Sequence, residues 1–166
     1  VRTNRRRTEP MSVAERFYDA FALGDWHTMG MTYAQHATFS DPVFPLLSAE
    51  EVRAMWHMLL SRAQDLSLNY NVVAESEDGA RVVWVARYTF GQTGRPVTNR
   101  VVTEMRFGAG RIVKQVDRFG LWRWSRQALG LPGLLLGWTP MMRDKIQNQA
   151  AAGLRKFVQQ ERQRGR

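Results

Sequence analysis

With 166 residues, 44% of them hydrophobic and 23% charged, the chain has the length and composition of one globular domain, which excludes a second large domain. The absence of cysteine excludes disulfide scaffolds, thiolate metal sites and cysteine nucleophiles, and it is compatible with the reducing cytoplasm in which we expect the protein. The formal net charge of +9 comes from the two ends of the chain. Residues 1–10 carry +3 (four Arg, one Glu), residues 11–120 carry −1 (eleven basic, twelve acidic) and residues 121–166 carry +7 (nine basic, two acidic). The net charge therefore does not by itself indicate a nucleic-acid-binding surface.

Three helices are predicted before the sheet. Ser12 and Glu15 have the spacing of a capping box, and apolar residues at helical spacing follow them. Asp25 is a favoured N-cap residue and begins a shorter second helix, which we expect to run through Tyr33. A third helix, with two glutamates in its first turn, is predicted over residues 49–63.

After the third helix the hydrophobic pattern changes to a period of two residues, which is typical of strands. Four strands are predicted over residues 66–76, 81–91, 96–107 and 112–119. The segments between them are short and rich in glycine, which favours an antiparallel meander. We expect this sheet to curl over the helices and to form an α+β domain with a concave apolar face.

Both ends of the chain differ from the domain between them. Residues 1–11 are expected to be a disordered basic tail. Residues 121–166 are predicted to be an aromatic and basic helical extension, in which Thr139 and Pro140 begin the last helix as N-cap and first helical residue. Apolar residues recur every four positions along that helix, so it has an apolar stripe that must pack on something.

Three roles stay open for the extension. It closes over the domain or exchanges with a partner subunit, it lies on an anionic membrane surface as basic amphipathic segments with tryptophan do, or it contacts nucleic acid. The first role is favoured. Nucleic acid is the least favoured partner, because no binding motif accompanies the charge.

Three sequence segments carry a resemblance to a known superfamily: residues 16–25 (RFYDAFALGD), 33–42 (YAQHATFSDP) and 105–113 (MRFGAGRIV). Together with the order of helices and strands, they resemble the nuclear transport factor 2-like superfamily, in the branch of ketosteroid isomerases and SnoaL-like polyketide cyclases. The resemblance covers residues 12–120. It implies a cone in which a curved antiparallel sheet wraps three N-terminal helices around an apolar cavity, and a homodimer formed through the outer face of the sheet.

Two aspartates are the candidate catalytic residues. The resemblance matches Asp41 to the general base of ketosteroid isomerases and Asp117 to a catalytic acid of SnoaL-like cyclases and epoxide hydrolases. Strand alternation also turns Asp117 toward the cavity. Two carboxyls that face one apolar cavity have raised and separated pKa values, which makes one an acid and the other a base. The alternatives are a turn residue before proline for Asp41 and an edge residue paired with an arginine for Asp117.

The chain departs from ketosteroid isomerases at the oxyanion hole. The resemblance implies a tyrosine of the first helix and a protonated aspartate there, and the matching residues are Phe17 and Thr103. Neither is an equivalent donor, so steroid isomerisation is disfavoured. Tyr18 lies about 100° further around the helix, so we do not expect it to replace Phe17. Trp56 occupies the place of a supporting tyrosine, while Tyr33 is retained.

The cavity is predicted to hold a flat apolar ligand, because aromatic residues alternate along the strands that face it. The alternative is that these rings fill the cavity as core. The candidate ligand-binding residues are Phe17, Tyr33, Trp56, Trp84, Tyr88, Asn99, Thr103 and Phe119.

The sequence predicts a protein that binds a small apolar molecule and performs isomerisation, cyclisation or hydration by proton transfer between Asp41 and Asp117. No metal or cofactor is expected, because His27, His36 and His57 lack metal-ligand spacing and no nucleotide-binding motif is present. We expect a homodimer without nucleic acid. The rival interpretations are a non-catalytic ligand carrier or interaction module, and a peripheral membrane protein attached through its C-terminal helix.

Overall fold

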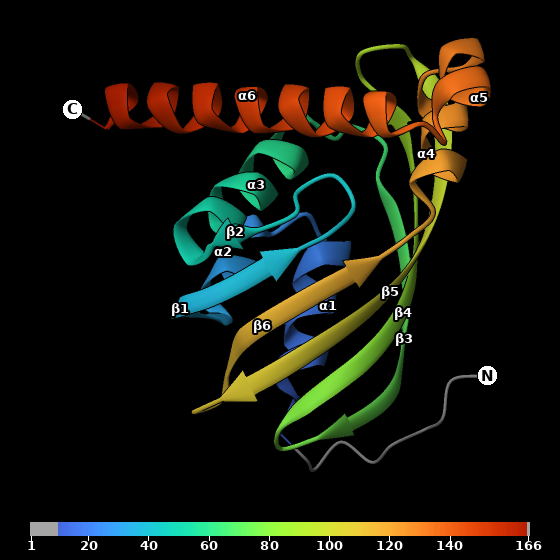
Figure 1. Cartoon of the computed structure of the whole chain (residues 1–166). Helices are drawn as coiled ribbons and strands as arrows, with labels where there is room; N and C mark the ends of the chain where they lie inside the picture. Colours follow the sequence, from blue (N-terminus) through green and yellow to red (C-terminus); the bar gives the residue numbers. More distant parts are fainter. Residues whose placement is uncertain (1–9, 166) are drawn as a thin grey trace.

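A computed structural model describes residues 10–165 of the protein (Figure 1). Most of the basic tail expected over residues 1–11 therefore lies outside the described residues. The elements are, in chain order, α1 (Val13–Ala22), α2 (Trp26–Met31), β1 (Tyr33–Ser40), β2 (Leu47–Ser48), α3 (Ala49–Arg62), β3 (Ser67–Ser76), β4 (Gly79–Phe90), β5 (Arg95–Gly108), β6 (Arg111–Arg118), α4 (Leu121–Ala128), α5 (Leu131–Leu136) and α6 (Pro140–Arg164).

Side-chain hydrogen bonds confirm the predicted helix starts. The Ser12 hydroxyl accepts from the Glu15 N–H, and the Glu15 carboxylate accepts from the Ser12 N–H, both at 3.1 Å. Asp25 caps α2 by accepting from the Thr28 N–H at 3.0 Å. Ser48 begins α3 with a second capping box. These bonds satisfy backbone N–H groups that have no partner inside their own helix.

The sheet has six strands in the order β2-β1-β6-β5-β4-β3. Strands β3 to β6 form the predicted antiparallel meander, with continuous pairing between β4 and β5. The sequence pattern does not predict the other two strands. Strand β1 pairs parallel with β6, and β2 pairs antiparallel with β1, so the sheet contains one parallel pair.

The prediction that the second helix runs through Tyr33 is wrong. Helix α2 ends at Met31, and Tyr33 is the first residue of β1. The parallel partner of β1 lies far along the chain in β6, where Gln115 is the register partner of Phe39. Pairing of this kind is a tertiary interaction that local preferences do not encode.

Helix α1 lies on the concave face of the curled sheet (Figure 1). Phe17 and Tyr18 are both fully buried, although they are neighbours in sequence. A helix on a flat surface buries one stripe, whereas this curved sheet and α3 cover α1 over a wider arc. The α+β cone expected from the sequence is thereby confirmed.

The C-terminal extension packs on the domain that precedes it. Helix α6 crosses over α3 (Figure 1), and the apolar stripe predicted for it is buried at Met142, Ile146 and Leu154. The Gln147 side-chain amide donates to the Pro42 carbonyl at 3.1 Å. The stripe of α6 is therefore already covered by its own domain.

Candidate functional site

Asp117 is the end point of two hydrogen-bond chains inside the cone. The first chain starts at β4, where the Trp84 indole N–H donates to the Thr103 hydroxyl at 2.8 Å. Thr103 lies on β5 directly opposite Asp117 on β6, and its hydroxyl donates to Asp117 Oδ1 at 2.7 Å. All three side chains are buried.

The second chain starts at α3 and reaches the same carboxylate oxygen. The Trp56 indole N–H donates to the Tyr33 hydroxyl at 3.0 Å, and this hydroxyl donates to Gln115 Oε1 at 2.6 Å. The Gln115 amide then donates to Asp117 Oδ1 at 3.0 Å. Among the residues that the structure describes, no side chain or backbone group hydrogen-bonds to Asp117 Oδ2.

Burial raises the pKa of the Asp117 carboxyl from 3.8 to about 7. The hydrogen bonds from Thr103 and Gln115 oppose this shift in pKa, and the charge of Asp41 adds to it. Asp117 is only 4% exposed and forms no ion pair with any described residue. The interpretation of Asp117 as the partner of an arginine is therefore wrong, since Arg118 pairs with Glu104 at 3.1 Å instead.

Asp41 shapes the turn that follows β1. Its Oδ1 accepts from the backbone N–H groups of Val43 and Phe44 at 2.7 and 2.6 Å, the geometry expected of an aspartate before proline. Burial nevertheless raises the pKa of Asp41 to about 6, and the two backbone hydrogen bonds oppose that shift. Asp41 thus combines a structural role with a carboxyl poised near neutral pH.

Tyr18 is a candidate site residue that its position on the first helix did not predict. It is fully buried, and its hydroxyl is the one buried side-chain polar atom of residues 10–165 without a hydrogen-bond partner. Burial, and then the charge of Asp117, raise the pKa of Tyr18 well above its usual range. An offset of about 100° does not remove Tyr18 from the site, because the cone encloses α1 on more than one side.

The other predicted site residues divide into buried and half-buried side chains. Phe17 is fully buried and packs edge-on against Tyr33 and Trp56, with ring centroids 5.8 and 5.9 Å apart. Trp84 and Thr103 are buried in the chains described above. Three residues are only half-buried, and they are Tyr88, Asn99 and Phe119. A ligand-binding role for all of these residues stays a prediction.

The C-terminal extension covers the segments that carry the two aspartates. A cluster of Leu121, Met142 and Ile146 packs with Val43 and Phe119, which lie two residues after Asp41 and Asp117 respectively. The Trp124 indole N–H donates to the Tyr88 hydroxyl at 2.8 Å. Burial raises the pKa of Tyr88, and the charge of Asp41 contributes to the shift. We call α4, α5 and α6 the cap.

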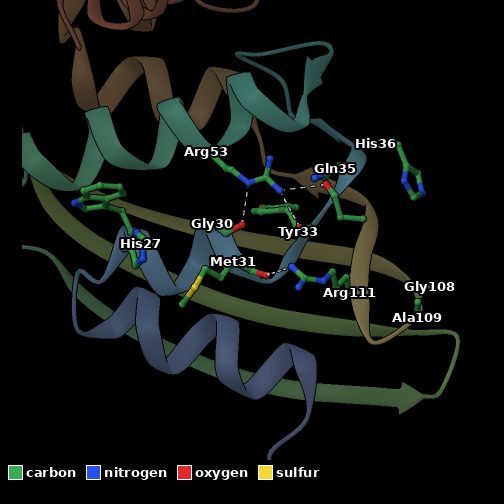
Figure 2. Close-up of a pocket in the computed structure, with 12 residues that line it drawn as sticks. His27, Gly30, Met31, Tyr33, Gln35, His36, Arg53, Gly108, Ala109 and Arg111 are labelled. Atoms are coloured by element: carbon green, nitrogen blue, oxygen red, sulfur yellow. Dashed lines mark hydrogen bonds between the residues drawn. The ribbon is translucent and has the colours of Figure 1, made fainter. Parts of the chain in front are cut away.

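Two cavities on the described residues lie away from the aspartates. The larger, of about 680 Å³, is formed by α2, β1, α3 and the β5–β6 turn (Figure 2). In it the Arg53 guanidinium donates to the carbonyls of Gly30 and Tyr33 at 3.0 and 2.8 Å, and Arg111 donates to that of Met31 at 2.8 Å. These arginines thus bind backbone carbonyls at the end of α2 and at the start of β1. Over residues 10–165, no three His, Asp or Glu side chains are grouped to hold a metal ion.

Comparison with known proteins gives the family. A family model of the SnoaL-like domain matches residues 14–115. The chain belongs to this family. The matched segment of the SnoaL-like domain contains Asp41 and ends two residues before Asp117. No curated protein matches the sequence.

Solved structures share the SnoaL-like fold at low sequence identity. A protein from Catenulispora acidiphila DSM 44928 with a ketosteroid isomerase-like fold, solved with trimethylamine, has a TM-score of 0.63 and 16% identity over 77% of this chain and 97% of its own. IdmH from Streptomyces antibioticus, a proposed polyketide cyclase, has a TM-score of 0.59 and 22% identity over 72% and 96%. TerC, co-crystallised with polyporic acid, has a TM-score of 0.61 and 13% identity over 71% and 96%. The protein is thus a member of the nuclear transport factor 2-like superfamily, in its SnoaL-like branch.

Proposed function

We propose that this SnoaL-like protein binds a small, flat, apolar molecule and catalyses proton transfer on it with Asp117 and Asp41. The observation that carries the proposal is the buried Asp117 carboxyl, which has two hydrogen-bond chains fixed on one oxygen and no cation beside it. A buried carboxyl without a counter-charge lowers the stability of the folded state near neutral pH. A catalytic role accounts for its presence, because a general acid or base works best with a pKa near the operating pH.

The two aspartates have different roles in this proposal. With pKa values of about 7 for Asp117 and about 6 for Asp41, Asp117 more often carries a proton near neutral pH and Asp41 is more often ionised. Asp41 is therefore the base that removes a proton from carbon, and Asp117 is the acid that donates to the oxygen or carbon that becomes negative. Neither step needs a redox cofactor.

The cap determines how a substrate reaches these residues. Val43 and Phe119, in the segments that carry the aspartates, pack against Leu121, Met142 and Ile146 of the cap, and we propose that the substrate enters where these side chains meet the cap. A small-molecule ligand is supported by the structural neighbours, since TerC was co-crystallised with polyporic acid. The missing isomerase donors at Phe17 and Thr103 keep steroid isomerisation disfavoured.

Deuterium exchange tests the proposed chemistry without knowledge of the natural substrate. The probe is 2-tetralone, a flat bicyclic ketone, and exchange of the protons beside its carbonyl in D₂O is followed by NMR. We expect the wild-type protein to accelerate this exchange above buffer. Asp41→Asn and Asp117→Asn should each lower the accelerated rate by about a hundredfold or more, the usual contribution of a general acid or base.

The matched control is Asp144→Asn, because Asp144 is an exposed aspartate of α6 and its replacement should leave the rate unchanged. If the wild-type protein binds 2-tetralone, as followed by tryptophan fluorescence, without accelerating the exchange, the protein is a carrier. Equal rates for the wild type and both aspartate variants contradict the catalytic proposal as well.

Tyr18 is proposed to donate its hydroxyl to the negative charge that develops on the substrate. In Tyr18→Phe we expect slower exchange, by about a hundredfold for one lost donor. We also expect the free energy of unfolding to rise by about 1 kcal/mol, because the variant removes a buried hydroxyl that has no partner. Exchange rates and urea unfolding of the same sample check both effects. A less stable variant with a normal rate would assign Tyr18 to the core alone.

The homodimer expected from the sequence remains part of the proposal. The outer face of the sheet supports it, because four half-buried valines alternate there with the residues that point into the cone, namely Val83, Val85, Val102 and Val116. Apolar side chains on one face of a sheet are typical of a surface that packs against a partner. Analytical ultracentrifugation of the wild type and of Val102→Glu tests the dimer.

A further inference from the structure

Helix α5 carries the most exposed apolar surface of the described chain. Five of its six residues are exposed, and the exception is Gly133. The neighbouring Trp138 and Met141 are 70% and 67% exposed. The exposed leucines are Leu131, Leu134, Leu135 and Leu136, with exposed fractions from 41% to 71%. We call residues 131–141 the apolar tip. Exposed apolar surface of this extent indicates a binding surface.

The apolar tip is held in place by close packing behind it. A Cβ atom on Gly133 would lie 2.0 Å from the Ser125 carbonyl oxygen, so α5 touches the backbone of α4. The indole N–H groups of Trp122 and Trp138 donate to the carbonyls of Leu134 and Leu135 at 3.3 and 3.1 Å. The exposed leucines are therefore carried on a fixed support. Helix α5 lies at the opposite end of the cap from the C-terminus of the chain (Figure 1).

Arginines without carboxylate partners precede and follow the apolar tip in the sequence. Arg123, Arg126 and Arg143 form no ion pair with any described residue, and the sequence from 119 to 143 contains no Asp or Glu. A cavity of about 400 Å³ lies directly beside the tip, and the residues that line it include Arg95, Arg126, Leu131 and Leu134. Positive side chains and apolar side chains therefore meet in one recess.

We propose that the apolar tip inserts into the surface of an anionic phospholipid membrane, with Arg95 and Arg126 binding a lipid phosphate in the recess beside it. Leucine and tryptophan side chains enter the boundary between headgroups and acyl chains, and arginines bind the phosphates above them. The association is peripheral, because no helix of residues 10–165 is long and apolar enough to cross a bilayer.

This proposal differs from the attachment through the C-terminal helix that the sequence suggests. The apolar stripe of α6 is buried on its own domain at Met142, Ile146 and Leu154, so α6 has no free apolar face for a membrane. The apolar tip begins before α6, ends at Met141 in the first turn of that helix, and is exposed. The apolar tip is also separate from Asp41 and Asp117, so a test of membrane binding does not depend on the proposed proton-transfer function.

Vesicle sedimentation tests the proposal with the full chain. The probes are phosphatidylcholine vesicles with and without 30% phosphatidylglycerol. We expect the wild-type protein to sediment with the anionic vesicles, at least tenfold more tightly than with phosphatidylcholine alone, and to be released by high salt. Leu131→Gln combined with Leu135→Gln should weaken binding at least tenfold. Leu23→Gln with Leu46→Gln is the matched control, because these leucines are 84% and 70% exposed elsewhere.

A second pair of variants tests the recess. Arg95→Gln with Arg126→Gln should weaken binding to anionic vesicles and reduce its dependence on salt. Arg100→Gln with Arg106→Gln removes the same charge from the exposed sheet face and should retain most of the binding. Quenching of tryptophan fluorescence by lipids brominated on their acyl chains should be smaller in Trp138→Phe than in the wild type, which locates the tip in the bilayer.

Three outcomes overturn the proposal. The wild-type protein stays in the supernatant with both kinds of vesicle, or the two leucine pairs behave alike, or the wild type forms an oligomer that Leu131→Gln with Leu135→Gln separates while vesicles are not bound. The last outcome assigns the apolar tip to a second copy of the chain. Circular dichroism of each variant shows that it is folded.

Discussion

Asp117→Asn is expected to stabilise the protein at pH 8 while it removes the proposed activity. Burial raises the pKa of Asp117 from 3.8 to about 7, so the ionised carboxyl at pH 8 costs folding free energy on the order of 4 kcal/mol. Asparagine keeps a carbonyl oxygen that accepts from Thr103 and Gln115, and it removes the buried charge. The variant should therefore have a higher free energy of unfolding at pH 8.

The raised pKa of Asp117 determines how the free energy of unfolding changes with pH. A carboxyl with a raised pKa in the folded state holds a proton there that the unfolded chain has already lost, so its contribution to stability is fully present below about pH 4. The contribution is lost as the pH rises through about 7. The raised pKa of Asp41, about 6, acts in the same direction. Wild-type stability should fall between pH 4 and pH 8, and it should fall less in Asp117→Asn.

Urea unfolding at pH 4.5, 6 and 8 measures both curves. The difference in unfolding free energy between the variant and the wild type should be small at the lowest pH and should grow with pH. Asp144→Asn serves as the control, since Asp144 is exposed and its replacement should give parallel curves. A variant that is destabilised equally at all three pH values would show that Asp117 is not a buried acid of raised pKa.

Gly133→Ala is expected to separate α5 from α4. A Cβ atom at this position would lie 2.0 Å from the oxygen and 2.4 Å from the carbon of the Ser125 carbonyl. Both contacts are to backbone, which cannot rotate away as a side chain can, so we expect a loss of about 3 kcal/mol, the upper part of the range for overpacking. Limited proteolysis should cut the variant between residues 121 and 139 faster than the wild type, and urea unfolding should show the loss of stability.

Gly153→Ala is the matched control for this substitution. A Cβ atom on Gly153 meets no other atom within 4 Å, and the residue lies inside α6. Alanine is the better helix former, so the variant should gain about 0.5 to 1 kcal/mol of unfolding free energy. If both alanine variants are equally stable, the close approach of α4 and α5 is not a constraint on the cap.

Local chemistry was sufficient to predict most of the elements. The capping residues Ser12, Asp25 and Thr139 and the glycine-rich turns of the meander act within a few residues, and the structure confirms the helix starts and strands that they predict. Strand β1 could not be predicted in this way. Its residues include Ala34, Gln35 and Ala37, which favour no strand by themselves, and its hydrogen bonds depend on β6.

In the candidate site, too, some features follow from the local sequence and others depend on tertiary pairing. Alternation along the last strand predicts that Asp117 points into the cone, and the structure places it there with 4% exposure. The same alternation puts Gln115 on that face, and it is the signal that would have found this second partner. The bond from Thr103 depends on the register between β5 and β6, and the nearness of Tyr18 to Asp117 depends on how far the sheet curls. Neither is encoded in a short sequence window.

The direction of the two hydrogen-bond chains determines where a proton sits on Asp117. Both chains begin at an indole N–H, which can only donate a hydrogen bond, and each later group in a chain accepts one hydrogen bond and donates the next. Asp117 Oδ1 therefore accepts two hydrogen bonds whether the carboxyl is neutral or ionised. The neutral acid must therefore carry its hydrogen on Oδ2. Gain or loss of that hydrogen leaves every neighbouring dipole as it was, which keeps the reorganisation that accompanies each transfer small.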